Sequence, residues 1–406
     1  MVVRSIPLAG LCLVAALLLP SAHAADTVAV LPLFNENESS APNLDWIGEG
    51  VAETIHEALS SAGLLVLARE DREEVYRRLA VRTGVVLTKA SVIKIGETLD
   101  AGPVVYGEFK VDPVPLPGAP ATNLQSQIAI ELHVLDLKKL HEAQPLMQSG
   151  PLTDLSRMEM KLAWMLLKEL DPAAPSEADF MRDRTAVPID AMESYVRGLM
   201  SANADQKIKL FSQAARIDEH FSQPAFQLGR MMFQKKDYKT SEQWLVKVTR
   251  SDSHYLEASF LLGICYYHQD DFDGAIRQFR MVVNEIPLNE VYNNLGAALS
   301  RRNDTSSLYN FNKALEGDQA DPDYWFNAGY ALWKQGQFAQ AADRFRAVLD
   351  RSADDQEATS MLGRCLRSDG PRPGDPRTEG RERIKTTFED SAFRQLQAEL
   401  KSKPAQ

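Results

Sequence analysis

From residue 189 onward, apolar positions follow the spacing of amphipathic helices, and the pattern restarts at nearly constant intervals. One glycine marks the same point of each unit, with spacings of 31, 34, 33, 33 and 34 residues: Gly198, Gly229, Gly263, Gly296, Gly329 and Gly363. Glycine inside a helix costs roughly 1 kcal/mol relative to alanine, so its recurrence indicates close packing between helices. The pattern predicts a solenoid of stacked helix pairs over residues 189–367, with about five and a half units.

Two further positions of the unit lie at a fixed distance from the glycine. With the glycine as position 8, position 20 is filled by Ser241, Ala275 and Ala341, and position 24 by Leu245, Phe279 and Phe345. This order of residues resembles the tetratricopeptide repeat, which implies an all-α superhelix with a concave groove. We expect the small residues to let the two helices of a unit approach closely, and the residue at position 24 to fill the space behind them.

Residues 25–170 carry a different pattern. Four stretches have the length and composition of strands: residues 27–33, 64–67, 103–109 and 128–134. In the last of these, apolar and polar positions alternate, which predicts an antiparallel strand with one solvated face. Helical spacing predicts a helix that begins near Trp46 and another over 155–170. The expected fold class is α+β multidomain: a small α/β domain, as a two-layer or three-layer sandwich, followed by the all-α array.

The α/β segment contains four strings in this order: VAVLPLFNENES, WIGEGVAETIHEAL, LLVLARE and GPVVYGEF. Together they resemble the TolB amino-terminal-like domain over about residues 26–170. The resemblance implies a small docking module of bacterial envelope proteins, and it implies no catalysis. The pair Glu49-Gly50 departs from the Asp-Gly that the family often has.

The first 24 residues have the pattern of a targeting segment. Arg4 precedes a 12-residue apolar stretch over 8–19, which is too short to span a membrane, and Ala22-His23-Ala24 has the form of a cleavage site. We therefore expect a cleaved signal peptide over 1–24 and an exported, periplasmic protein.

Stretches rich in proline, glycine and charge separate the predicted domains. Residues 171–188 are predicted to link the α/β domain to the array, and residues 368–387 to form a flexible linker. A narrow apolar stripe that includes Phe393 and Leu396 predicts a C-terminal capping helix within 388–406.

Composition limits the classes of partner. The 406-residue chain has a net charge of −11, which argues against broad nucleic-acid binding and against a polybasic membrane patch. Beyond the first stretch, no run is apolar enough to serve as an integral membrane span. Cys265 and Cys365 occupy the same position of units three repeats apart, so we expect two separate buried thiols rather than a disulfide.

The search for catalytic motifs is negative. The sequence contains no HExxH, Cys-x-x-Cys, Gly-x-Ser-x-Gly or phosphate-loop motif, so we expect no catalytic residue, no metal and no cofactor. His268, Asp270, Asp271 and Asp273 have the residue types of metal ligands. They fall at the turn between the two helices of one unit, and we interpret them as a solvated turn.

Positions 5, 9 and 12 of each first helix share one face, and by resemblance this face lines the concave groove. Most of these positions are aromatic or large aliphatic, and asparagines lie beside them at position 6. The predicted partner-binding residues are Phe226, Arg230, Phe233, Phe260, Ile264, Tyr267, Asn294, Phe326, Asn327, Tyr330 and Trp333. Two occupants of the groove remain open: a protein or peptide partner, whose backbone the asparagines would bond, or the chain itself, through the N-terminal domain or residues 388–402.

These patterns predict a non-catalytic exported scaffold or adaptor, with the groove as the partner site and the α/β domain as a second docking module. One alternative is an accessory factor for the assembly or export of an envelope protein. Another is a ligand sensor or enzyme with its site in residues 25–170, which predicts a deep polar pocket with converging ionisable groups. The oligomeric state stays open.

Overall fold

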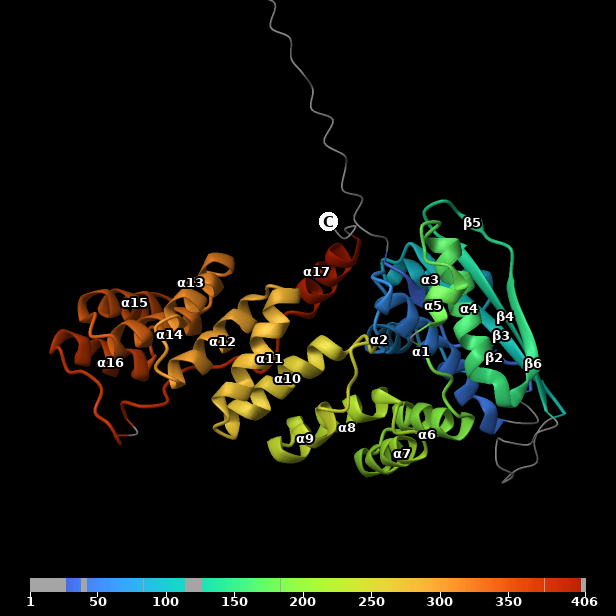
Figure 1. The fold of residues 1–406 in the computed structure, drawn as a ribbon. Coiled ribbons are helices and arrows are strands. Elements are labelled where there is room, and N and C mark those ends of the chain that lie inside the picture. The colour runs from blue at the N-terminus through green and yellow to red at the C-terminus, as the bar shows by residue number, and fades with distance from the viewer. Residues whose placement is uncertain are drawn as a thin grey trace, which may run out of the picture.

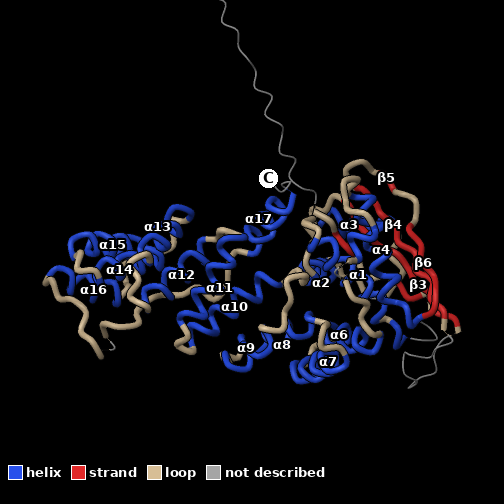
Figure 2. The backbone as a smooth tube through the Cα atoms, viewed as in Figure 1, coloured by secondary structure: helices blue, strands red, loops and turns tan. Residues whose placement is uncertain are grey.

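The computed structural model describes residues 27–37, 42–82, 84–113, 126–182, 184–375 and 377–402. A small α/β domain stands at one end, and a long array of helices extends from it (Figure 1). The strands of the described chain all lie in the α/β domain (Figure 2). The fold class is α+β, as the sequence predicted. The predicted signal peptide over 1–24 lies outside the described residues.

The α/β domain is built on a sheet centred on two long antiparallel strands, β3 (Pro103–Asp112) and β4 (Gln127–Asp136). The shorter strands β1 (Ala29–Val30) and β2 (Phe34–Asn35) run parallel to β3, and β5 (His141–Glu142) and β6 (Leu146–Pro151) pair with β4. The antiparallel strand predicted over 128–134 is confirmed, with Val105 opposite Val134.

The predicted strand over 27–33 is interrupted. Pro32 has no N–H to donate to a neighbouring strand, and the N–H of Leu33 donates instead to the Gly48 carbonyl (3.2 Å) in α1 (Trp46–Ser61). A Cβ atom at Gly48 would lie 2.1 Å from the Leu33 carbonyl oxygen, so only glycine permits this approach. The strand is therefore divided into β1 and β2 by the contact that seats α1.

One other strand prediction differs from the structure, and one strand was not predicted. Residues 64–67 contribute only an isolated bridge between Val28 and Val66. Strand β6 was not predicted, because Gly150 and Pro151 at its end are residues that weaken a strand pattern, and Pro151 is tolerated there at the strand terminus.

Helices cover both faces of the sheet, which makes this part of the domain three-layered. Alternate residues of a strand point to opposite faces, and Val30 and Val105 share a core with α1 and α4 (Leu155–Leu170). Ala29 and Val104 pack instead with α2 (Arg69–Arg78) and α3 (Lys89–Thr98). Helix α4 has the bounds that its apolar stripe predicted. Short helical turns occupy Pro42–Leu44, Leu152–Asp154 and, within the predicted linker, α5 (Glu177–Met181).

The array consists of antiparallel helix pairs followed by one unpaired helix. Its helices are α6 (Ile189–Met200), α7 (Ala204–Ile217), α8 (Ser222–Gln234), α9 (Tyr238–Leu245), α10 (Tyr255–His268), α11 (Phe272–Glu285), α12 (Asn289–Arg301), α13 (Ser307–Gly317), α14 (Pro322–Lys334), α15 (Phe338–Arg351) and α16 (Gln356–Leu366). The first pair shares one hydrophobic core with the α/β domain, because Tyr195 and Phe211 belong to the cluster that contains Trp46.

The recurring glycines confirm the predicted close packing. A Cβ atom added at Gly263 would lie 2.7 Å from the ring of Phe279, the residue at position 24 of the same unit. A Cβ atom at Gly296 would lie 2.7 Å from the ring of Phe311, which fills that place one residue earlier because its unit is one residue shorter. Gly363 differs, since its nearest atom would be 3.5 Å away. Among the described residues, α16 is not followed by a second helix of its own unit, so this last glycine is not needed for a close approach.

Two predictions about single residue types are confirmed as well. Cys265 and Cys365 are buried free thiols. Asp271 caps α11 by accepting a hydrogen bond from the Gly274 N–H (2.8 Å), and Asp270 has a φ of 60°, so this stretch is a turn. Across the described residues, we find no helix with the length and apolar character needed to cross a bilayer.

Candidate functional site

The structure brings the predicted groove residues together on the first helices α8, α10, α12 and α14. Nine of the eleven are buried, and Arg230 and Phe233 are half-buried. Phe260, Phe326 and Trp333 have an exposed fraction of 0%. These aromatic side chains therefore belong to the core of the folded chain, and truncating one of them would leave a cavity.

The chain itself fills the groove. After α16 it turns back and runs along the first helices toward the α/β domain (Figure 1). We call residues 377–389 the strap; the final helix α17 (Asp390–Ser402) follows it and lies beside the α/β domain. The sequence left open whether a partner or the chain itself occupies the groove, and the structure shows the chain itself there. Most of the strap lies in the stretch that was predicted to be a flexible linker.

Asparagine side chains hold the backbone of the strap. Asn327 Nδ2 donates to the Arg383 carbonyl (2.7 Å), and the Arg383 N–H donates to Asn327 Oδ1 (2.8 Å). Asn294 does the same for Lys385, with distances of 2.7 and 2.8 Å. Asn293 Nδ2 adds a second bond to the Arg383 carbonyl (2.8 Å). The asparagines thus bond an extended backbone that belongs to the chain itself, whereas the sequence led us to expect bonds to the backbone of a partner.

Basic side chains of the strap meet a row of acidic residues at the starts of α14 and α16. We call Asp321, Asp323, Asp355 and Glu357 the acidic row. Arg383 binds Asp355 through two nitrogens (2.8 and 3.0 Å), and its guanidinium lies over the Phe326 ring (3.7 Å to the centroid). Lys385 Nζ lies 2.6 Å from Asp321 and 2.7 Å from Asp323, and Arg381 pairs with Glu357.

Within the acidic row, contact with the strap favours the ionised form of Asp355. Burial by itself raises the pKa of Asp355, but the hydrogen bonds from Arg383 and from the Ala358 N–H outweigh it and lower that pKa. Asp355 also caps α16 through the same Ala358 N–H (2.8 Å). One carboxylate therefore fixes the start of a helix and receives the strap.

The opposite side of the strap is held less completely. Ser300 Oγ donates to Glu382 Oε1 (2.6 Å), and Lys334 Nζ lies 3.8 Å from the same oxygen. Within the described residues, no donor reaches the other buried oxygen, Glu382 Oε2. A buried carboxylate oxygen without a hydrogen bond destabilises the arrangement that contains it.

Aromatic and backbone contacts extend the interface at both ends. Phe388 packs edge-on against Phe260 (5.1 Å between centroids) and also contacts Phe393 of α17 (4.7 Å). At the other end, Tyr330 OH donates to the Thr378 carbonyl (2.8 Å). The groove is therefore occupied over the length of α10 to α14.

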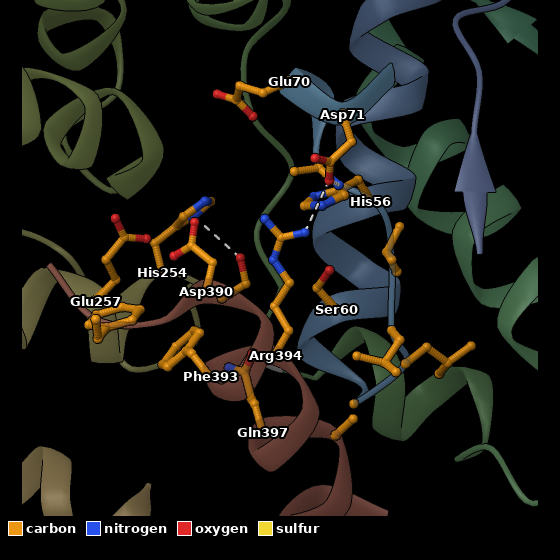
Figure 3. Close-up of a pocket in the computed structure, with 18 of the residues that line it drawn as sticks. His56, Ser60, Glu70, Asp71, His254, Glu257, Asp390, Phe393, Arg394 and Gln397 are labelled. Atoms are coloured by element: carbon orange, nitrogen blue, oxygen red, sulfur yellow. Dashed lines mark hydrogen bonds and ion pairs between the residues drawn. The ribbon is translucent and has the colours of Figure 1, made fainter. Parts of the chain in front are cut away.

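Helix α17 joins the groove to the α/β domain. Arg394 Nη1 lies 3.2 Å from Asp71 of α2 (Figure 3). A polar cavity of about 360 Å³ lies between α17, α1 and α10, and His56, His254, Glu257 and Asp390 are among the residues that line it (Figure 3). The end of the chain therefore contacts both domains.

A cluster that the sequence did not reveal lies next to this cavity. Glu57 of α1, Asp252 and His254 place their ligand-type atoms within 4.8 Å of one another. Glu57 Oε1 accepts from the Ser253 N–H (2.6 Å), and Asp252 Oδ1 lies 3.1 Å from His254 Nδ1. All four carboxylate oxygens of Glu57 and Asp252 accept hydrogen bonds, from Ser222, Ser253 and His254. The cluster therefore fastens α1 to the segment before α10.

The charges of this cluster depend on one another. Burial alone lowers the pKa of His254, but the hydrogen bond to Asp252 and the charges of Asp252 and Glu57 raise it to about 10. Burial raises the pKa of Glu57, which nearby Asp252 raises further. The raised pKa favours a protonated His254 beside Asp252 at neutral pH, and we call Glu57, Asp252 and His254 the ion-pair lock.

A smaller cavity of about 280 Å³, with a mixed polar and apolar lining, lies beside Glu49. Burial would raise the pKa of Glu49, but Arg72 and Arg69 lower it, and Arg69 Nε donates to Glu49 Oε1 (2.7 Å). Arg69 also donates to the Leu199 carbonyl of α6 (3.1 Å). Glu49 is thus engaged in ion pairs within the α/β domain, and its partner Arg69 also bonds the first helix of the array.

Two family models of the tetratricopeptide repeat match the chain, over residues 257–287 and 326–370. No curated protein matches it.

Solved structures give matches to the helical array. The chain is similar to YrrB, described as a TPR protein with an unusual peptide-binding site, at 16% identity over 44% of this chain and 89% of that one, with a TM-score of 0.35. It is also similar to MamA from Desulfovibrio magneticus RS-1, at 18% identity over 41% of this chain and 95% of that one, with a TM-score of 0.37.

Proposed function

Because the helix pairs of the array are tetratricopeptide repeats, we propose that this protein is a non-catalytic scaffold that binds a segment of another protein in its concave groove. The α/β domain, with its resemblance to the TolB amino-terminal-like domain, serves as a second docking module. The predicted signal peptide supports an exported, periplasmic location for this work. An alternative is an accessory role, in which the bound protein is an envelope protein whose assembly or export this scaffold assists.

One observation carries the proposal: the groove holds an extended segment by its backbone. Asn294 and Asn327 each bond both the N–H and the carbonyl of one residue of the strap, and neither contact uses the side chain of that residue. A site of this kind accepts an extended chain of many sequences, since every residue except proline offers the same two groups. The groove therefore has the chemistry of a peptide-binding site.

Crosslinking in the native cell tests the proposal. A photoactivatable amino acid replaces Phe233, which is half-buried on α8, and in a matched control it replaces Tyr309, which is 62% exposed on α13. We expect a protein that crosslinks from position 233 and not from position 309. The crosslink should disappear when Asn294→Ala and Asn327→Ala are added. Crosslinked products that are the same from both positions would contradict a groove-specific partner.

A further inference from the structure

We propose that the strap is an intramolecular substitute for an external ligand, and that this ligand is an extended protein segment with basic side chains at every second position. The inference rests on the proposed function, because it names the class of segment that the groove binds. It also implies that the strap must leave the groove before the ligand enters.

The spacing of the strap defines the ligand. Arg381, Arg383 and Lys385 are two residues apart, so in an extended chain they point to one side. That side faces the acidic row, which receives them with five ion pairs of 3.2 Å or less from Arg383 and Lys385. A ligand with acidic or apolar residues at these positions would leave four carboxylates unpaired in a partly buried site.

The residues between the basic ones set a second requirement. Glu382 points to the other side, toward Ser300 and Lys334, and Ile384 packs with the apolar core of the array. Phe388 then lies against Phe260. The preferred segment therefore alternates basic residues with one acidic and one apolar residue, and carries an aromatic residue further along.

The strap is an incomplete ligand, which makes its displacement feasible. Glu382 Oε2 is buried and receives no hydrogen bond within the described residues. A segment that places a better-fitting group there would bind the groove with a more favourable contact free energy than the strap does. Covalent attachment offsets this weaker contact, because a short connection gives the strap an effective concentration at the groove on the order of millimolar. An external segment therefore binds the intact protein much more weakly than its contacts alone would allow.

Release of the strap would also change the contact between the domains. Arg394 of α17 pairs with Asp71 of the α/β domain, and Phe393 of α17 packs on Phe388 of the strap. An external ligand that displaces the strap would break the contact between Phe388 and Phe393 and weaken the ion pair between Arg394 and Asp71. Occupancy of the groove is thus coupled to the position of α17 on the α/β domain.

The test uses the full chain and a fluorescent peptide of residues 377–393, with affinity measured by anisotropy. Arg383→Glu places a negative charge beside the acidic row and so weakens the attached strap without changing the groove. We expect this variant to bind the peptide at least tenfold more tightly than the unaltered protein does. Arg377→Glu is the matched control, because Arg377 is exposed and pairs only with Asp375 among the described residues; it should leave the affinity unchanged.

Two further measurements test the charge pattern. Asp355→Asn keeps the cap of α16 but removes one charge of the acidic row, so adding it to Arg383→Glu should weaken peptide binding about tenfold. A peptide with Arg381→Glu, Arg383→Glu and Lys385→Glu should not bind. Circular dichroism and the melting temperature verify that each variant is folded, and Arg383→Ala replaces Arg383→Glu if the latter does not fold.

Several outcomes would overturn the inference. If the charge-reversed peptide binds as tightly as the original, the groove is a peptide site without this preference, and the proposed function survives. If neither peptide binds the folded Arg383→Glu protein and no crosslink forms from position 233, both proposals fail. If sedimentation shows that the protein dimerises and that the dimer no longer binds the peptide, the occupant of the groove is a second copy of the chain. This result would overturn the inference as well.

Discussion

Asn327 forms two hydrogen bonds with the backbone of Arg383, donating to its carbonyl (2.7 Å) and accepting from its N–H (2.8 Å). One repeat earlier, Asn294 makes the same pair of bonds to Lys385. Both asparagines are at position 6 of their units, so the repeat places identical amide groups along the groove. The strap, which advances two residues between them, is bound as an extended chain.

Loss of one asparagine should loosen the strap locally. In Asn327→Ala the carbonyl of Arg383 keeps its bond from Asn293, but its N–H is left without the acceptor it has in the structure. We expect a loss of about 1–3 kcal/mol in the stability of the strap contact. Hydrogen–deuterium exchange measures this directly, as faster exchange at the amides of residues 383 and 385.

Asn310→Ala is the control for this prediction. Asn310 is also buried, but its side chain bonds the Ser306 carbonyl at the start of its own helix, α13. Its replacement should leave exchange of the strap amides unchanged. Equal protection of residue 383 in Asn327→Ala and in the unaltered protein would show that the asparagine does not hold the strap.

The glycines of the array provide a second prediction. In Gly296→Ala the new methyl group would lie 2.7 Å from the buried ring of Phe311, which has no space to move. We expect a loss of about 1–3 kcal/mol in the free energy of unfolding. In Gly363→Ala the nearest atom is 3.5 Å away, so the higher helix propensity of alanine should add up to about 1 kcal/mol. Chemical denaturation of both variants tests whether the two effects have opposite signs.

The register of the repeats could be predicted because it is set by residue types that recur at regular positions in the sequence. Gly263 and Phe279 have the same spacing as Gly329 and Phe345, and Asn294 and Asn327 follow from the same register. The strap could not be predicted, because the asparagines bond its backbone N–H and carbonyl groups, which every residue except proline has. Proline and glycine around it favoured a flexible linker instead.

The junction between the domains was missed for a different reason. Glu57 and Ser253 are 196 residues apart in sequence, and each lies in a segment that looks like ordinary polar surface. Only the packing of α1 against the array brings them together. The TolB-like resemblance and the signal peptide stay predictions, the latter because residues 1–24 lie outside the described part of the chain.

A buried acid in the α/β domain leads to a third prediction. Burial raises the pKa of Glu159 to about 8, against a usual value of 4.5, and its one described hydrogen bond comes from Thr54 (2.9 Å). The folded state therefore keeps Glu159 protonated while the unfolded state ionises it, and stability falls as the pH rises from 4.5 to about 8. Glu159→Gln removes this penalty and should stabilise the protein, by on the order of 2–4 kcal/mol near pH 8 and by much less near pH 5.

Glu169→Gln, on the exposed side of the same helix, is the matched control for Glu159→Gln. Melting temperatures of both variants and of the unaltered protein, measured between pH 5 and pH 8.5, give the comparison. A constant difference between Glu159→Gln and the unaltered protein over this range would show that Glu159 does not titrate as the structure implies.

The ion-pair lock between the two domains predicts a second pH dependence, which comes from a charged histidine rather than from a neutral acid. The folded-state pKa of His254 is about 10, above its usual 6.5, because Asp252, Glu57 and Glu257 favour the protonated ring more than burial opposes it. Protonated His254 therefore stabilises the fold fully below pH 6.5, and this contribution is lost as the pH rises toward 10. The melting temperature of His254→Gln should lie below that of the unaltered protein at pH 6.5, with the difference shrinking by pH 9.5. His268→Gln is the contrasting control: burial lowers the pKa of His268 below 6.5, so its difference from the unaltered protein should stay constant between pH 6.5 and 9.5. A difference for His254→Gln that does not change between pH 6.5 and 9.5 would exclude the ion-pair lock between Glu57, Asp252 and His254.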